Sequence, residues 1–124
     1  MITLTIKGSI PSKKNSKQWI WSRTQQRKLL VPSDNFNDWH EEWSYKLARS
    51  VPKRPFLRCK ITFRYFARDT RNRDLDNQNT SILDLLKDLS FIKDDNWFVV
   101  KEVNSKLVKV DPKNPRCEIK IVEI

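Results

Sequence analysis

Apolar and polar side chains alternate along residues 1–7, which predicts a half-buried strand that Gly8 ends. Two short apolar runs, at residues 19–21 and 29–31, flank a polar segment and predict a hairpin. The polar segment contains no glycine, and we expect its basic side chains to point outward at the hairpin tip. Alternation returns at residues 57–66 with one apolar and one basic face, which predicts a longer strand.

Apolar side chains recur at helical spacing in two segments. The first stripe follows a Ser-Asp cap signal at residues 33–34 and ends before Pro52. Its members are Phe36, Trp39, Trp43 and Leu47. The second stripe consists of Ile82, Leu85, Leu86 and Leu89. We interpret both stripes as core rather than as ligand platforms. The only histidine, His40, lies beside the first stripe, and we interpret it as structural rather than catalytic.

The C-terminal part of the chain contains three strand-like runs, at residues 97–103, 106–110 and 116–124. Asn104 and Ser105 are expected to turn the first run into the second, and residues 111–115 the second into the third. The element order is therefore strand, hairpin, helix, strand, helix and three strands. This order predicts one α+β domain over residues 1–124, with a mixed β-sheet and two main helices packed on it.

The composition is that of a folded domain. The chain has 124 residues, of which 38% are hydrophobic, and it contains five tryptophans, which excludes a disordered polybasic tail. No segment resembles a signal peptide or approaches the ~18 apolar residues of a membrane helix, so we expect a cytoplasmic protein without a membrane partner. Cys59 and Cys117 then fit two free, buried thiols better than one disulfide.

The whole chain has a net charge of +10, and most of this positive charge lies in its first half. Residues 1–60 carry 13 basic and 4 acidic side chains, whereas residues 61–124 carry 12 and 11. Such asymmetry indicates a polyanion-binding surface, although a merely soluble basic protein is the alternative. Trp19 and Trp21 lie among these cations and could stack on bases. The candidate DNA-binding residues are Lys13, Lys14, Lys17, Arg23, Arg27, Lys28, Arg71 and Arg73.

Two pairs of aspartates bracket the second helical stripe. Asp74 and Asp76 share a face only on an extended backbone, so we expect residues 74–76 to be extended, with Asp76 or Asn77 capping the helix. The helix carries the chain ~20 Å away, and an extended segment after it could bring Asp94 or Asp95 back. Clustered carboxylates suit a hard divalent cation that acts on phosphodiesters. The alternative is that the aspartates merely cap the helix, and their convergence in a structure would exclude it.

The central motif resembles the RusA family of Holliday junction resolvases, which are phage- and prophage-associated endodeoxyribonucleases. The resemblance is carried by Arg73-Asp74-Leu75-Asp76-Asn77, the apolar helix and Phe91-x-x-Asp94-Asp95. An N-terminal Pro11-x-x-x-Asn15 before the basic hairpin, and the C-terminal run Cys117-Glu-Ile-Lys-Ile, are also similar to the family.

The resemblance implies an Mg²⁺-dependent homodimer, with Mn²⁺ as the alternative metal, that nicks two opposed strands of a four-way DNA junction. It implies that Asp74, Asp76 and Asp95 are the catalytic and metal-binding residues, supported by Asn77 and Asp94. The family carries a lysine needed for cleavage four residues after the second aspartate, where this chain has Thr80. Lys93, or an arginine within residues 71–73, is the expected substitute.

Two alternative functions compete with this one. One is a junction-binding protein with weak or no cleavage, which Thr80 favours because its side chain carries no positive charge. The other is a basic nucleic-acid-binding structural protein in which Asp74 and Asp76 only cap a helix.

Overall fold

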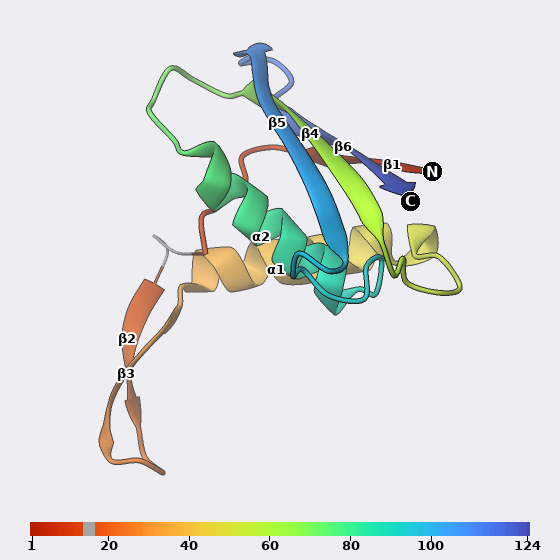
Figure 1. Cartoon of the computed structure of the whole chain (residues 1–124). Coiled ribbons are helices and arrows are strands. Elements are labelled where there is room, and N and C mark those ends of the chain that lie inside the picture. Colours follow the sequence, from red (N-terminus) through yellow and green to blue (C-terminus); the bar gives the residue numbers. More distant parts are fainter. Residues whose placement is uncertain (14–16) are drawn as a thin grey trace.

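The computed structural model describes residues 1–13 and 17–124 and contains a four-stranded mixed sheet with two helices on one face (Figure 1). The strand order is β1-β6-β4-β5. Strand β6 pairs antiparallel with β1 and β4, whereas β4 and β5 are parallel. The strands are β1 (Ile2–Lys7), β4 (Cys59–Ala67), β5 (Val100–Val110) and β6 (Arg116–Glu123). The predicted α+β fold class, with a mixed sheet and two helices, is therefore confirmed.

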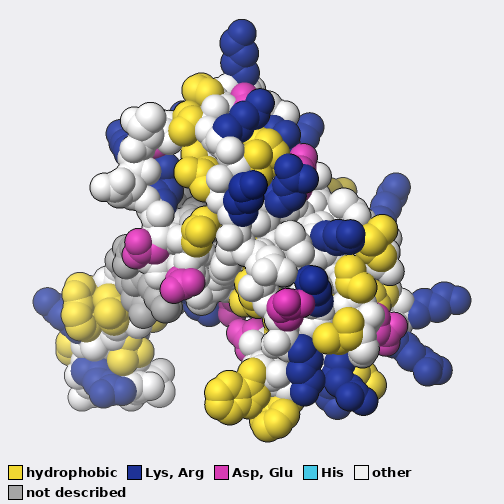
Figure 2. Space-filling view, turned by 45° about the horizontal axis from the view of Figure 1, so that its top comes forward, with side chains coloured by type: hydrophobic (Ala, Val, Ile, Leu, Met, Phe, Trp, Pro, Cys, Tyr) yellow, Lys and Arg dark blue, Asp and Glu magenta, His cyan; other side chains and the backbone are white. Residues whose placement is uncertain are grey.

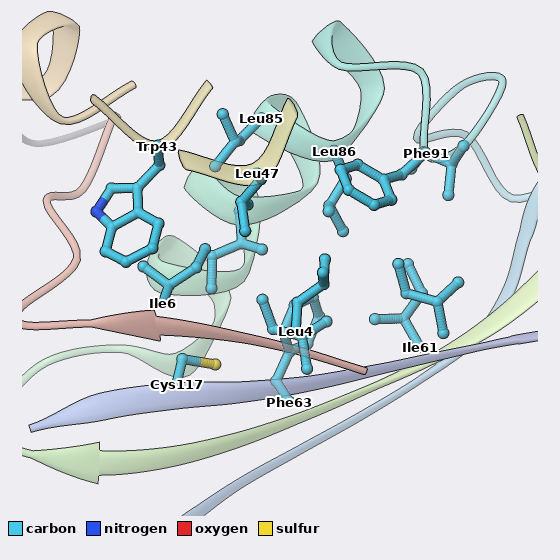
Figure 3. Close-up of a cluster of buried hydrophobic side chains, with 14 of the residues drawn as sticks. Leu4, Ile6, Trp43, Leu47, Ile61, Phe63, Leu85, Leu86, Phe91 and Cys117 are labelled. Carbon is cyan, nitrogen blue, oxygen red and sulfur yellow. The ribbon is translucent and has the colours of Figure 1, made fainter. Parts of the chain in front are cut away.

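Helix α1 (Asp34–Leu47) and helix α2 (Leu75–Asp88) cover the sheet with their apolar stripes. Ser33 caps α1 as expected, because its hydroxyl accepts a hydrogen bond from the amide of Phe36 at 3.3 Å. A short 3₁₀ helix, η1 (Ala48–Ser50), follows α1. Figure 3 shows Trp43 and Leu86 of the helices on the side of the sheet where Phe63 lies, and all three belong to one buried cluster. The tryptophans of α1 are buried in this core, as predicted.

Strand β5 is a correction to the sequence analysis, which placed a turn at Asn104 and Ser105. The strand runs through both residues and pairs with β4 from Cys59↔Val100 to Ala67↔Val110. Asn and Ser are common in turns, but nine paired positions with the central strand β4 override that preference. The hydroxyl of Ser105 also donates a hydrogen bond to Asn79 of α2 at 2.9 Å, which holds the strand against the helix.

The predicted hairpin forms a separate two-stranded sheet, β2 (Lys17–Ser22) and β3 (Arg27–Pro32). It projects away from the helices and the main sheet (Figure 1). Gln26 supplies the positive φ, 50°, that a glycine would usually provide in such a turn. Because the hairpin packs on so little else, Trp19 and Trp21 remain 67% and 61% exposed.

Both cysteines lie in the core as free thiols, which confirms that expectation. Burial raises the pKa of the Cys59 thiol and raises the pKa of Cys117 to about 12. Both thiols are therefore protonated and unreactive at neutral pH. Among the described residues, no helix is long and apolar enough to cross a membrane.

Candidate active site and nucleic-acid surface

The first pair of aspartates lies at the start of α2. Asp74 precedes the helix with an extended backbone, φ −85° and ψ 131°, while Asp76 is in the first helical turn. The expectation that all of residues 74–76 are extended is thus wrong, because the backbone carbonyl of Asp74 already accepts from the amide of Gln78 and opens the helix. Both side chains are exposed at one end of α2.

Asp74 occupies the N-cap position without acting as a cap. Its carboxylate accepts no hydrogen bond from the helix backbone. The contact that the structure does give this carboxylate is a long hydrogen bond, 3.4 Å, from the side-chain amide of Asn77. Capping therefore does not account for this carboxylate, which Asn77 instead holds at the surface.

A polar pocket of about 610 Å³ opens beside Asp74 and Asn77. Arg68 and Arg73 from the loop after β4 line it, together with Asn35 and Trp39 from α1. The sequence analysis did not single out Arg68 or Asn35. Arg68 could have been found because it belongs to the same arginine-rich loop as Arg71 and Arg73, but nothing in the sequence pairs that loop with α1.

Asp69 organises the arginine-rich loop. Its carboxylate accepts from the Arg73 guanidinium at 2.9 Å and from the amide of Arg71 at 3.1 Å. These contacts, led by the Arg73 guanidinium, hold the pKa of the Asp69 carboxyl below its usual range. Both guanidinium groups lie beside this carboxylate, Arg73 at 2.9 Å and Arg71 at 3.9 Å, and the Arg71 side chain is 83% exposed.

Asp94 and Asp95 lie at the other end of the molecule, and the prediction that they return to Asp74 within one chain is wrong. Their loop leads into Val99, whose carbonyl accepts from Cys59 at the beginning of β4. Asp74 instead follows the loop that leaves the end of β4. The nine residues of β4 separate these ends by about 30 Å at ~3.3 Å per residue. Figure 1 shows the loop before α2 and the loop after it at opposite ends of that helix.

The chain stays at that end because it is anchored there after α2. Ser90 adopts a positive φ of 68° and reverses the direction of the backbone. Phe91 and Ile92 then enter the core, and Phe56 pairs with this segment through backbone hydrogen bonds. Burying two large apolar side chains there outweighs any return of the segment along the helix.

Asp94 and Asp95 differ in their local contacts. The amide of Asp95 donates to the Asp94 carboxylate at 2.7 Å, and this bond holds the pKa of Asp94 below its usual range. Asp94 is half-buried and Asp95 is exposed. The Asp94 carboxylate therefore stabilises the turn, whereas the Asp95 carboxylate is exposed to solvent.

Thr80, where the resemblance leads one to expect a lysine, points its hydroxyl back to its own helix. The hydroxyl donates to the Asp76 carbonyl at 2.8 Å. This bond satisfies the side chain locally and places no charge near either aspartate.

The other basic candidates fall into three groups. Arg23, Arg27 and Lys28 lie on the hairpin, where the Arg27 guanidinium is supported by Gln25 at 2.8 Å. The Lys13 ammonium is bound to Asp84 of α2 at 3.0 Å. Lys14 lies outside the described residues, and of Lys17 only the backbone, in β2, is described. Figure 2 shows Lys and Arg side chains around hydrophobic ones over the end of the sheet, and both kinds on the hairpin.

His40 contacts carboxylates of α2. Its Nε2 lies 2.9 Å from Asp88 and 3.7 Å from Asp84, and this trio is the one group of three potential metal ligands found in the described part of the chain. It joins α1 to α2, and Lys13 already neutralises Asp84. These contacts support the structural interpretation of His40.

These features define a class of protein, namely a small basic α+β domain with exposed carboxylates beside an arginine-rich loop, suited to polyanionic substrates. The chain belongs to the RusA family of endodeoxyribonucleases. The family model described as endodeoxyribonuclease RusA matches residues 10–122, nearly the whole chain, which confirms the resemblance. No curated protein matches the chain.

Proposed function

We propose that this protein is a Mg²⁺-dependent endodeoxyribonuclease that acts as a homodimer on four-way DNA junctions in the cytoplasm, with Mn²⁺ as an alternative metal. The observation that carries the proposal is the family match over residues 10–122, together with the exposed Asp74 and Asp76 carboxylates at the start of α2.

The donor set fits a hard divalent cation. Asp74, Asp76 and Asp95 offer exposed carboxylate oxygens, which Mg²⁺ and Mn²⁺ prefer. When bound, such a cation activates water and stabilises the charge that develops on a phosphodiester. Asn77 would orient Asp74 through their hydrogen bond, and Asp94 would fix the turn that presents Asp95.

The separation of Asp95 from Asp74 and Asp76 supports a site built from two chains. In a two-fold dimer, Asp95 of one copy can join Asp74 and Asp76 of the other, and symmetry then creates two such sites. Two related sites suit a substrate on which two opposed strands are cut.

The DNA surface would consist of the arginine-rich loop and the projecting hairpin. Arg71 is exposed next to the acidic end of α2, which places a phosphate contact beside the proposed chemistry. On the hairpin, the exposed Trp19 and Trp21 offer faces for stacking on unpaired bases at a junction.

A second function is favoured by one observation. Thr80 donates its hydroxyl to its own helix and supplies no cation, which favours a junction-binding protein with weak or no cleavage. Both functions share the fold and the DNA surface and differ only in the rate of hydrolysis.

The experiment is single-turnover cleavage of a synthetic four-way junction in Mg²⁺ or in EDTA. We expect cleavage only with the metal. Asp74→Asn should abolish cleavage and leave junction affinity equal or higher, because it removes a metal ligand and also a negative charge that repels phosphate. Glu41→Gln, which removes one exposed carboxylate from α1, is the matched control and should cut like the wild type.

Cleavage by Asp74→Asn at the wild-type rate would refute the assignment of the metal site. Tight junction binding without cleavage by the wild-type protein would establish the second function instead.

A further inference from the structure

Trp39 of α1 has a buried indole N–H group without an acceptor. The side chain is 8% exposed, and no described residue accepts a hydrogen bond from its Nε1. Buried tryptophans usually find such a partner, because an unpaired N–H group in the interior costs free energy. Trp39 also lines the polar pocket of about 610 Å³ beside Asp74. An acceptor bound in that pocket would therefore complete the contacts of Trp39.

The charged side chains that line this pocket favour an anion. Arg68 and Arg73 line it, whereas Asp74 contributes the single carboxylate of its lining. Arg73 is paired with Asp69 at 2.9 Å, but Arg68 is exposed and forms no ion pair with another described residue. The positive charge of Arg68 is therefore available to a ligand.

Two helices begin at the same pocket. Asn35 in the first turn of α1 and Asn77 in the first turn of α2 both line it. The first amides of a helix have no partner within the helix, and the aligned peptide dipoles place partial positive charge there. Helix N-termini bind phosphate groups for this reason. Both helix ends therefore add to the attraction that Arg68 and the Trp39 N–H group offer to an anion.

A phosphate suits these groups better than a nucleobase does. Guanidinium and indole N–H groups only donate hydrogen bonds, and the charged oxygens of a phosphodiester only accept them. A nucleobase also presents donors, and it gains affinity by stacking on an exposed aromatic face. Trp39 offers no such face, because its ring is buried.

We propose that this pocket binds the DNA phosphate next to the one that is cut, with the Arg68 guanidinium and the Trp39 N–H group as donors. The inference rests on the proposed function and deepens it, because Asp74, a proposed metal ligand, lies on the same pocket. A second fixed phosphate sets the register of the strand on the metal. Arg68 and Trp39 thus contact the substrate without touching the reacting atoms.

The first test combines changes in the DNA with changes in the protein. A methylphosphonate replaces one charged phosphate oxygen with a methyl group. It is placed on both opposed strands of a four-way junction, one position at a time around the crossover. Affinity is measured in Ca²⁺, so that no cleavage is needed. We expect one position at which the methylphosphonate weakens wild-type binding roughly tenfold, as the loss of a hydrogen bond to a charged group does.

The variants identify the protein side of that contact. Arg68→Gln and Trp39→Phe should bind the unmodified junction more weakly and lose little further affinity at the sensitive position, because the contact is already absent. One control is Arg54→Gln, an exposed cation in the segment before β4. The other is Trp43→Phe, which changes a buried tryptophan of α1 that does not line the pocket. Both controls should retain the full methylphosphonate effect.

The second test uses the wild-type protein, so that it does not depend on the folding of a variant. The indole N–H resonance of Trp39 is followed by NMR while the junction is added in Ca²⁺, with that of Trp43 as the reference. A hydrogen bond to phosphate should move the Trp39 resonance downfield. The junction with a methylphosphonate at the sensitive position should leave that resonance in place.

Any of three results would overturn the phosphate site. One is a methylphosphonate effect that is equal in the wild type, Arg68→Gln and Trp39→Phe at every position. Another is a Trp39 resonance that the junction does not move. The third is coupling of Trp39→Phe to an abasic nucleotide instead of a methylphosphonate, which would place a base in the pocket. Each would leave cleavage in Mg²⁺ standing, whereas a wild type that does not cut would refute the nuclease and leave these binding measurements intact.

Discussion

Single residues at the start of α2 decide how accurately the candidate site is held. Asn79 is buried there and accepts from the hydroxyls of Tyr65 at 2.6 Å and Ser105 at 2.9 Å. One side chain thus joins α2 to β4 and β5 just three residues after Asp76. A site that must hold carboxylates within a fraction of an ångström needs such supporting contacts.

Thr80 provides a test at the same scale. We expect Thr80→Lys to raise the single-turnover rate on a four-way junction with little change in affinity, because a cation there acts mainly on charge that develops in the transition state. An increase on the order of tenfold or more is expected, since one well-placed partner of such charge is worth up to about 10²–10³ in rate.

The control for that measurement is Thr80→Gln, which lengthens the side chain without a charge and should leave the rate unchanged. If Thr80→Lys is no faster and the wild type cuts robustly, another cation such as Lys93 or Arg71 already supplies the charge. If neither protein cuts, the junction-binding function is supported.

At the scale of whole elements, the alternation of apolar side chains predicted β1 and β4 correctly, and helical spacing predicted α1 and α2. These segments bury one face each, and burial leaves a period in the sequence. Strand β5 was missed because Asn104 and Ser105 are turn residues locally, and only the pairing with β4 makes them part of a strand.

The location of Asp95 could not be predicted for a related reason. Chain length allows residues 90–95 to return along α2, and only the docking of Phe91 and Ile92 in the core prevents it. Tertiary anchoring of this kind leaves no local pattern. The sequence therefore marks the acidic residues as candidates, whereas their distribution over the two ends of α2 leaves no local signal in it.

At the scale of whole elements, the hairpin of β2 and β3 provides a prediction about DNA binding. Replacing Arg23, Arg27 and Lys28 with glutamine should flatten the slope of log affinity against log salt by about 0.9 for each lost phosphate contact, or ~2.7 if all three touch the duplex arms. The measurement is junction binding by fluorescence anisotropy across a salt series in Ca²⁺ without cleavage.

The comparison for the hairpin variant is glutamine at Lys53, Arg54 and Arg58, three exposed cations in the segment before β4. That variant should keep the wild-type slope. Equal slopes for the wild type and the hairpin variant would move the DNA surface away from β2 and β3.

At the scale of the whole molecule, the two ends of α2 allow a subunit-mixing experiment. Asp74→Asn and Asp95→Asn should each be inactive alone. If each site draws Asp74 from one copy and Asp95 from the other, a mixed dimer has one intact site and one site with both changes. Mixing the two inactive proteins should restore nicking of a single strand, detectable on a labelled junction.

Mixing Asp74→Asn with Asp76→Asn serves as the comparison, because those two changes lie at the same end of α2 and each mixed site keeps one of them. No activity should return in that mixture. Restored nicking in neither mixture would mean that the sites are not shared between chains.

The distance between Asp95 and Asp74 within one chain also affects when such an enzyme could cut the DNA of its own cell. If each site needs residues from two copies, an isolated chain carries the two parts of the site at opposite ends of α2 and cannot cut the DNA around it. Cutting capacity then rises with roughly the square of the amount of protein while copies are scarce. A low level of expression would therefore leave cellular DNA intact. Only strong expression would produce enough dimer to cut DNA.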